Sequence, residues 1–475
     1  MTQARSQIAP GPAPELELTV TDLDPLARGL ARTATGQLVR IPGADLGERL
    51  RVALVPGQRG RLLGRIVGLL EPSPWRTDPA CPQAESCPGC QLRHLTGPRQ
   101  LTLKRELLLR ALTRLGGVAP ALVEEAIPHP QPDGQRIRAG AACLPDPTTG
   151  EGLVLGMRPL PGGSGRPIDL ARCPAQHPQV NQLLAQAART LVELGLPLAD
   201  RVAGTGLLRH VLAHGSTTGG GRLCLAVARD GLADAGGLPY LAEVLARRLL
   251  PGEPAVALLL DPLPRRTHAT SSGKALLLRG EPRVSFTVGD TLLTAREGAW
   301  TPLSPGAAHL LVATVARLLD ELGDQGDDGR LLEIGCGVGT LTLPLARRFR
   351  EGVGVDASRV AIADAEENRQ RAGIMGLRFR TGWAHHAVRR LAAGGQRFGT
   401  ALLHSIRLPY GPAVLDLLPT LGVRRLVYVS PAASSLARDL GVLQQTGWEL
   451  QRVVPVDQIP ATAHLMGVAA LRRVG

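Results

Sequence analysis

Apolar and polar positions divide the chain into four stretches with different patterns. Residues 1–14 are polar and rich in proline, which predicts a loose tail. Residues 15–72 contain short β-rich runs, such as LELTVTDL and RLRVALVP, that glycine and proline interrupt. Short strands at this spacing favour a small antiparallel β-barrel, and a small β-sandwich is the alternative.

The third stretch, residues 73–300, mixes strand-like and helical patterns. It begins with a loop rich in proline and cysteine, and apolar residues at helical spacing in 100–115 then predict an amphipathic helix. Strand-like runs such as RLCLAVARD and AVALLLD alternate with predicted helices at 179–195 and 237–250. These patterns together predict a central α+β domain.

In the fourth stretch, residues 301–475, helices and buried strands alternate. A helix is predicted from Gly306 to Leu322, followed by the strand LLEIG, a helix from about Thr340 and the strand GVGVD. The alternation continues almost to the end of the chain, which favours a doubly wound parallel sheet. The sequence therefore predicts a multidomain protein with an N-terminal barrel, a central α+β domain and a C-terminal α/β Rossmann-like domain.

Charge and composition point to a polyanionic partner. The formal net charge is +13, and only two of the 54 basic residues are lysines. An arginine-rich surface suits a polyanionic partner whose phosphates the guanidinium groups neutralise. The N-terminal segment has no apolar core typical of a secretion signal, and no run is long enough for a membrane helix, so we expect a cytoplasmic protein that does not contact membranes.

A glycine-rich turn is the strongest local motif. In LLEIGCGVGTLTLPLA, Glu333 precedes Gly335, Gly337 and Gly339 at the junction of a predicted strand and helix. Asp356 ends the next strand, where a carboxylate can accept hydrogen bonds from two ribose hydroxyls. This spacing predicts an S-adenosylmethionine (SAM) site formed by Glu333, Gly335, Gly337 and Asp356. The alternatives are a nucleotide-binding Rossmann domain and a turn that no longer binds a ligand.

Cysteines cluster in the loop that opens the third stretch. Cys81, Cys87 and Cys90 follow a C-x5-C-x2-C spacing, and Cys173, which like Cys81 and Cys87 precedes a proline, is the candidate fourth ligand. Four thiolates suit either a [4Fe–4S] cluster or Zn²⁺, and the spacing alone does not separate the two.

These motifs, in this order, resemble the RNA uracil-5 methyltransferase family over nearly the whole chain. LARGLART, QLVRIPGA and GERLRVAL are similar to the TRAM domain, an oligonucleotide-binding barrel, and CPQAESCPGCQLRHL is similar to the family's iron–sulfur motif. The resemblance implies domains at 15–72, 73–300 and 301–475, with a helix at 97–116 that packs on the last of them. It also implies SAM as cofactor, a [4Fe–4S] cluster rather than zinc, and ribosomal or transfer RNA as substrate.

The resemblance fails at the residues that carry the family's chemistry. In that chemistry a cysteine thiolate adds to uracil C6, C5 takes the methyl group from SAM, and a carboxylate base removes the C5 proton so that the cysteine is released. The family reads roughly VSCNPATLARD where this chain reads VSPAASSLARD, so Pro431 takes the place of the nucleophile. Met466 takes the place of the glutamate base.

Three further positions of the same pocket differ. The family's DPPR aligns with His404-Ser405-Ile406-Arg407, so only the arginine is kept. A glutamine that helps to hold SAM aligns with Pro302, and an aromatic residue beside the glycine turn aligns with Gly335. No catalytic residue is therefore identified in this chain.

These differences predict a family member that does not make 5-methyluridine, while the rest of the resemblance implies that it still binds RNA. We also expect a monomer. One alternative is an active methyltransferase that modifies a ring nitrogen or a hydroxyl, with His404 or the pair His385 and His386 as base. The other is uracil-5 methylation with an unseen nucleophile.

Overall fold

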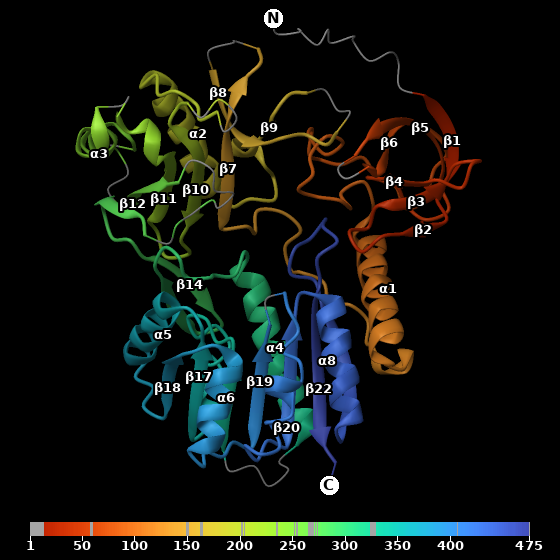
Figure 1. Ribbon diagram of the computed structural model, residues 1–475, viewed down its shortest axis with the longest axis vertical. Coiled ribbons are helices and arrows are strands. Elements are labelled where there is room, and N and C mark those ends of the chain that lie inside the picture. Colours follow the sequence, from red (N-terminus) through yellow and green to blue (C-terminus); the bar gives the residue numbers. More distant parts are fainter. Residues whose placement is uncertain are drawn as a thin grey trace, which may run out of the picture. The chain divides into compact units, whose positions relative to one another are not determined.

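The structure is a computed structural model that describes residues 14–57, 60–148, 152–161, 165–200, 203, 205–233, 236–250, 252, 255–264, 270, 272, 274–323, 329–405 and 407–474. The predicted tail at 1–14 lies outside the described residues except for its last residue. The chain divides into two compact units. Figure 1 labels their helices and strands. Unit 1 comprises Met1–Gln100, Arg158–Ile168 and Ala461–Ala463, and unit 2 comprises Leu101–Met157, Asp169–Pro460 and His464–Gly475.

Unit 1 contains a six-stranded sheet with the order β1-β5-β6-β4-β3-β2. Its strands are β1 (Glu15–Thr19), β2 (Asp22–Leu23), β3 (Gly29–Arg32), β4 (Leu38–Ile41), β5 (Arg49–Pro56) and β6 (Leu62–Glu71). Neighbouring strands are antiparallel except β4 and β6, which pair in parallel. In β5, Leu50 and Val52 are buried while Arg49 and Arg51 are exposed, which is the period-two pattern of a sheet with one solvated face.

Two buried carboxylates connect this sheet to the segment that follows it. Glu48 accepts hydrogen bonds from the guanidinium of Arg76 (2.8 Å), and Asp45 accepts from Arg99 (2.9 Å) and from the Ser73 hydroxyl (2.8 Å). Burial alone would raise the pKa of both carboxyls, but these hydrogen bonds outweigh it and the pKa of each is lowered. Both groups are therefore held as carboxylates in the folded unit.

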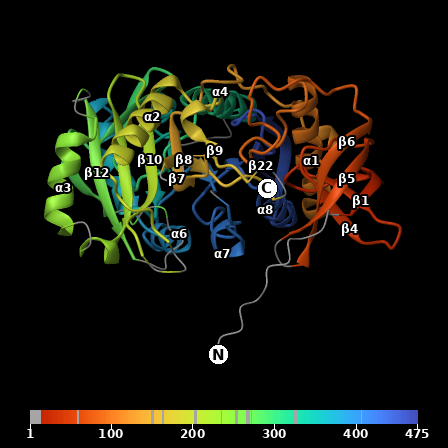
Figure 2. The ribbon, with the colours of Figure 1, turned by 90° about the horizontal axis from the view of Figure 1, so that it is seen from above.

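The central part of unit 2 is a seven-stranded sheet with the order β13-β12-β11-β10-β7-β8-β9. Its strands are β7 (Arg138–Asp146), β8 (Gly152–Met157), β9 (Ile168–Asp169), β10 (Leu208–Gly215), β11 (Gly221–Ala228), β12 (Val256–Leu263) and β13 (Leu276–Arg279). Helices α2 (Pro178–Glu193) and α3 (Gly237–Arg248) share one apolar cluster with it, and Figure 2 shows α3 beside β12. Both helices were predicted within a few residues. A hairpin of β14 (Val284–Val288) and β15 (Thr291–Ala295) follows.

The C-terminal part of unit 2 is an α/β sheet with the order β18-β17-β16-β19-β20-β22-β21. Strands β16 (Arg330–Ile334), β17 (Glu351–Asp356), β18 (Leu377–Thr381), β19 (Thr400–His404) and β20 (Arg425–Ser430) are parallel, as predicted. The hairpin of β21 (Trp448–Val456) and β22 (Met466–Arg473) adds two antiparallel strands at one edge. The helices are α4 (Pro305–Leu322), α5 (Arg359–Arg371), α6 (Ala384–Ala393), α7 (Pro412–Leu415) and α8 (Ala433–Gln445).

The helix predicted from about Thr340 is wrong. Residues 336–345 form successive hydrogen-bonded turns, and only a short 3₁₀ turn at Ala346–Arg348 follows. Pro344 lacks an N–H and disfavours a helical residue before it. The Thr342 hydroxyl donates to the Glu333 carboxylate, so the segment is bound to the strand it leaves rather than wound into a helix.

Helix α1 (Gly97–Gly116) runs from unit 1 into unit 2, and its residues from Leu101 onward belong to unit 2. There Leu108 and Leu112 join the apolar cluster that includes α8 residues, and the Gln444 amide donates to the Gly116 carbonyl (2.9 Å). The buried ammonium of Lys104 donates to Asp457 (2.7 Å). Within the described parts of the chain, no helix is long and apolar enough to cross a bilayer.

Candidate functional site

The glycine turn at the end of β16 requires glycine for steric reasons. Gly335 has φ = 86°, and a Cβ built there would lie 2.1 Å from the His404 carbonyl oxygen, which ends the neighbouring strand β19. Gly337 also has a positive φ of 55°, but a Cβ at that position would meet no neighbouring atom within 4 Å. The turn therefore lies directly over the carboxyl ends of β16 and β19, where the strand order of the sheet reverses. Ligands of doubly wound sheets bind at this crevice.

Glu333 provides a buried carboxyl group beneath the turn. One of its oxygens accepts the Thr342 hydroxyl, and the other, Oε1, is buried with no hydrogen-bond partner among the described residues. Burial, together with the nearby charge of Asp356, raises the pKa of Glu333 to about 8. An unpartnered buried oxygen is costly, so a ligand that donates a hydrogen bond or brings positive charge to this position would be stabilised.

Asp356 lies next to the turn, as the sequence predicts for the end of β17. Its Oδ2 accepts the N–H of Gly337 (3.0 Å), and its Oδ1 accepts the N–H of Ser358 (2.8 Å). Each carboxylate oxygen keeps a further lone pair, so the group can hold the turn and still accept from a ligand. The structure thus brings all four predicted cofactor residues to one edge of the sheet.

Three aromatic and basic side chains meet at the end of β19. The Trp300 and His404 rings are perpendicular, with centroids 6.0 Å apart, and the Arg138 guanidinium carbon lies 6.0 Å from the centroid of the Trp300 ring. Burial lowers the pKa of His404 to about 4, so its imidazole is neutral at physiological pH. Sequence reasoning identified His404 but missed Arg138 and Trp300, because the contacts join residues more than 100 positions apart.

The ends of β20 and β22 carry the residues that replace the family's nucleophile and base. Pro431 directly follows Ser430, whose hydroxyl accepts from the Ser405 hydroxyl (2.8 Å). Met466 begins β22 and is buried. Pro302 is also buried, just before Ser304 caps α4, while Arg407 is exposed. Ile406, between Ser405 and Arg407, lies outside the described residues.

Three thiols of unit 2 are not predicted metal ligands, those of Cys143, Cys224 and Cys336, and none of them offers a substitute nucleophile. Cys336 lies in the glycine turn, where burial and then the charge of Glu333 raise the pKa of its thiol well above the usual value. Burial also raises the pKa of Cys143 to about 12, and that of Cys224 further. All seven cysteines of the chain are described and none forms a disulfide bond. The thiolate form needed for attack is therefore strongly disfavoured at these three positions.

The predicted metal ligands lie in both units. In unit 1, Cys81 is buried, and the Cys87 sulfur accepts the N–H of Gly89 (3.4 Å) in the turn that leads to Cys90. In unit 2, Cys173 follows the short 3₁₀ turn Leu170–Arg172. Among the described residues, no group of three or more His, Cys, Asp or Glu side chains is arranged to hold a metal ion. The cluster with these four ligands stays a prediction.

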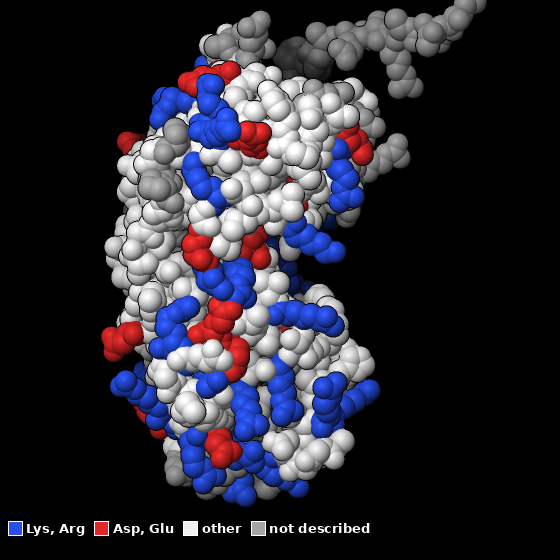
Figure 3. Space-filling model, turned by 90° about the vertical axis from the view of Figure 1, so that its left-hand side faces the viewer, with Lys and Arg blue, Asp and Glu red and all other residues white. Residues whose placement is uncertain are grey.

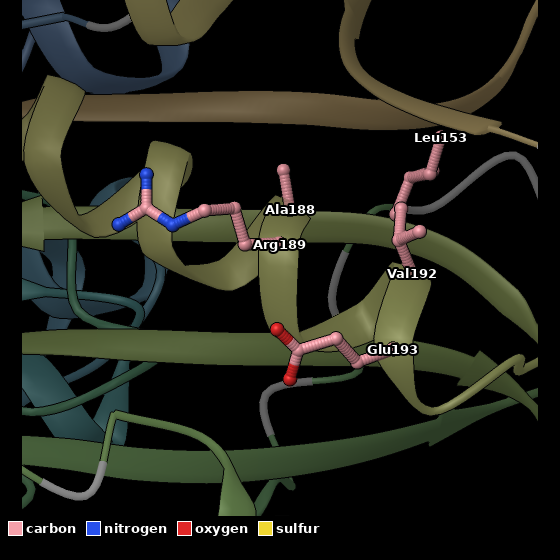
Figure 4. A pocket seen from close by; sticks show the side chains of 5 residues that line it. All are labelled: Leu153, Ala188, Arg189, Val192 and Glu193. Carbon is pink, nitrogen blue, oxygen red and sulfur yellow. The ribbon is translucent and has the colours of Figure 1, made fainter.

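A separate hollow lies on the central sheet, and no predicted site residue lines it. It has a volume of about 370 Å³ and is lined by Leu153 of β8 and by Ala188, Arg189, Val192 and Glu193 of α2 (Figure 4). It is wide open to solvent and combines two opposite charges with three apolar side chains. Nothing in this lining suggests a specific ligand.

Comparisons with known proteins support a methyltransferase domain around the glycine turn. A family model described as "Methyltransferase domain" matches residues 325–406. The chain is 32% identical to the 23S rRNA (uracil(1939)-C(5))-methyltransferase RlmD of Alkalilimnicola ehrlichii over 97% of both chains. It is 29% identical to an uncharacterized RNA methyltransferase of Halalkalibacterium halodurans over 96% of both chains.

A solved structure shares the fold along almost the whole chain. It is the tRNA (uracil-54, C5)-methyltransferase of Pyrococcus abyssi in complex with S-adenosyl-L-homocysteine, with a TM-score of 0.72 and 20% identity. The match covers 96% of this chain and all of the Pyrococcus abyssi chain. On the evidence of sequence identity and coverage, the chain belongs to the RNA methyltransferase family that includes the uracil-C5 methyltransferases.

Proposed function

We propose that this protein binds RNA and SAM but does not make 5-methyluridine through the covalent route. The observation that carries the proposal is the pair Pro431 and Met466, at the positions where the family resemblance expects the nucleophile and the base. A pyrrolidine ring and a thioether side chain neither attack uracil C6 nor accept the C5 proton. Uracil C5 is too weak a nucleophile to take a methyl group without that activation.

The glycine turn supports the cofactor half of the proposal. Glu333, Gly335, Gly337 and Asp356 would hold SAM, which supplies an electrophilic methyl group when bound. The unpartnered Oε1 of Glu333 and the open space at Gly337, where a Cβ would meet no atom within 4 Å, are consistent with a ligand at this turn. Asp356 would accept hydrogen bonds from the ribose with its remaining lone pairs.

Surface charge supports the RNA half. Exposed arginines lie along α5, β18 and α6. Figure 3 shows basic side chains gathered over the lower part of one face, where Figure 1 places α5 and β18. Trp383, 68% exposed, lies between β18 and α6 among these arginines. Arginines neutralise phosphates and exposed indoles stack on unpaired bases, so this composition suits a single-stranded segment of ribosomal or transfer RNA.

The aromatic and basic residues at the end of β19 favour a second candidate function, methyl transfer to a ring nitrogen or a hydroxyl. His404 would take the proton of an N–H or O–H while the S–CH₃ bond of SAM breaks and the new N–CH₃ or O–CH₃ bond forms. Its lowered pKa makes it a weak base, so this role requires an acceptor group that ionises readily. Trp300 and Arg138 beside it would stack on the base and contact its phosphate. Such atoms need no covalent activation by a cysteine.

Calorimetric titration and product analysis test these functions. We expect the protein to bind SAM and an rRNA or tRNA fragment, and to produce no 5-methyluridine when RNA is incubated with methyl-labelled SAM and digested to nucleosides. Label in 5-methyluridine would refute the main proposal. Label in a different nucleoside, lost in His404→Gln but kept in the matched variant His386→Gln, would establish the second function.

The iron–sulfur cluster is a further part of the proposal. We infer from the family resemblance, and not from the geometry, that Cys81, Cys87, Cys90 and Cys173 hold a [4Fe–4S] cluster rather than zinc. Anaerobic purification should give a brown protein with about four irons, and Cys87→Ser should lose them. A colourless protein that contains zinc would contradict the inference.

A further inference from the structure

Tyr410 occupies the crevice above the glycine turn. Its phenol oxygen lies 2.9 Å from the Ile334 carbonyl oxygen and 3.0 Å from that of His404, and it donates its single hydrogen toward these two acceptors. Ile334 and His404 are the last residues of β16 and β19, which are adjacent and parallel. The hydroxyl therefore bridges two strand ends at the point where the strand order reverses, which is the ligand-binding edge of a doubly wound sheet.

The loop that carries Tyr410 is held in place by buried residues of α8. The Asp439 carboxylate accepts the N–H groups of Tyr410 (2.7 Å) and Gly411 (3.0 Å), as well as the Tyr428 hydroxyl (2.5 Å). The Ser435 hydroxyl donates to the Arg407 carbonyl of the same loop (2.6 Å). Asp439 and Ser435 are both buried. The phenol is thus fixed by a network of charge-assisted hydrogen bonds and does not swing freely over the turn.

The phenol oxygen of Tyr410 lies directly beside Gly335 of the glycine turn. A Cβ at residue 335 would lie 3.0 Å from the Tyr410 oxygen, so the hydroxyl borders the space that a side chain at this position would enter. The aromatic residue that the family resemblance expects at 335 is absent, and an aromatic side chain instead reaches the same place from position 410. The cofactor crevice therefore has an aromatic wall, which comes from the loop after β19 rather than from the turn.

The surroundings of the phenol are electronegative. Burial, followed by the charges of Asp356 and Glu333, raises the pKa of Tyr410 above its usual range, so the hydroxyl stays protonated. Its hydrogen is directed toward the two carbonyl oxygens, and its lone pairs are left for a ligand in the crevice. Lone pairs, carbonyls and the Asp356 carboxylate together suit a cationic centre better than a neutral one.

We propose that Tyr410 is a positioning residue that makes the site discriminate between the cationic sulfonium of SAM and the neutral thioether of S-adenosylhomocysteine. The proposal rests on the proposed binding of SAM at the glycine turn. The phenol oxygen would accept the polarised C–H groups next to the sulfonium, an interaction that is lost once the methyl group has left.

Calorimetric titration of SAM and S-adenosylhomocysteine into the full chain and its variants tests the proposal. Tyr410→Phe keeps the ring and removes only the oxygen, so we expect SAM affinity to fall about three- to fivefold while S-adenosylhomocysteine affinity stays within about twofold. Tyr410→Leu should remove the preference at least as fully. The matched control Tyr240→Phe, at an exposed tyrosine of α3, should change neither affinity.

The outcomes separate this inference from the proposed function. If the unaltered protein binds neither ligand at millimolar concentration, the proposed SAM site is refuted and the role of Tyr410 with it. If the protein binds both ligands and Tyr410→Phe weakens them equally or not at all, only the role of Tyr410 is refuted. A fall in the ratio of the two affinities, which a merely structural role of the phenol would not produce, supports it.

Discussion

At the carboxyl edge of the C-terminal sheet, two neighbouring regions differ in which residues expected from the family resemblance they contain. At the ends of β16 and β17, the glycine turn, Glu333 and Asp356 form a compact set of backbone turns and carboxyl groups. At the ends of β20 and β22, Pro431 and Met466 offer no group that exchanges a proton or forms a bond. Under the proposed function, a cofactor-binding half lies beside a half without the covalent chemistry, so binding and catalysis would be separable properties of this site.

The largest expected effect comes from restoring the missing nucleophile. Pro431→Cys places a thiol after β20 while Met466 still leaves the protein without the base that would release the product. If uracil reaches this edge together with SAM, thiolate addition to C6 and methylation of C5 should therefore stall at a stable protein–RNA adduct. Denaturing electrophoresis with labelled RNA would show the adduct for Pro431→Cys and none for the control Pro431→Ser. Absence of any adduct would mean that uracil does not reach this edge, and would break the comparison.

The glycine turn should be the most sensitive part of the preserved edge. Gly335→Ala adds a Cβ that would meet the His404 carbonyl and also strains a positive φ, so we expect destabilisation by about 3–5 kcal/mol and loss of SAM binding. Gly337→Ala meets no atom within 4 Å and should cost only about 1 kcal/mol of backbone strain. Urea unfolding measures both. If the two variants lose the same free energy of unfolding, the atoms around residue 335 must move to make room for the added Cβ.

Glu333 should make the stability of the protein depend on pH. Its folded-state pKa of about 8 lies above the ordinary value of 4.5, so its contribution is full below about pH 4.5 and is lost as the pH rises through 8. Glu333→Gln should remove this loss and stabilise the SAM-free protein by a few kcal/mol at pH 8. Urea unfolding of both proteins at pH 6 and pH 8 measures the difference. An identical pH dependence in the variant would contradict the raised pKa.

A smaller effect, on RNA affinity, is expected at Trp300, whose ring lies beside His404 at the end of β19. If a base stacks on Trp300, Trp300→Ala should weaken RNA binding about tenfold, whereas Trp448→Phe, at a buried indole of β21, should leave it unchanged. Fluorescence anisotropy with a labelled RNA fragment measures both affinities. Unchanged binding in Trp300→Ala would place the RNA elsewhere on the protein.

The sequence predicted those features that are encoded locally. The glycine turn and Asp356 are set by residues close together in the chain, and the alternating helices and strands predicted the parallel part of the sheet. The helix expected from Thr340 is wrong because the bond between Thr342 and Glu333 is tertiary and competes with helix formation. Arg138, Trp300 and Tyr410 were missed for the same reason, since their contacts form only when distant segments pack.

The central claim is tested most directly with an RNA that contains 5-fluorouridine and with SAM. Fluorine at C5 cannot be removed by a base, so an enzyme that uses the covalent route remains bonded to this RNA. We predict that the unaltered protein binds the RNA and SAM but that intact-mass analysis finds only the free protein. A protein mass increased by the RNA and a methyl group would contradict the account.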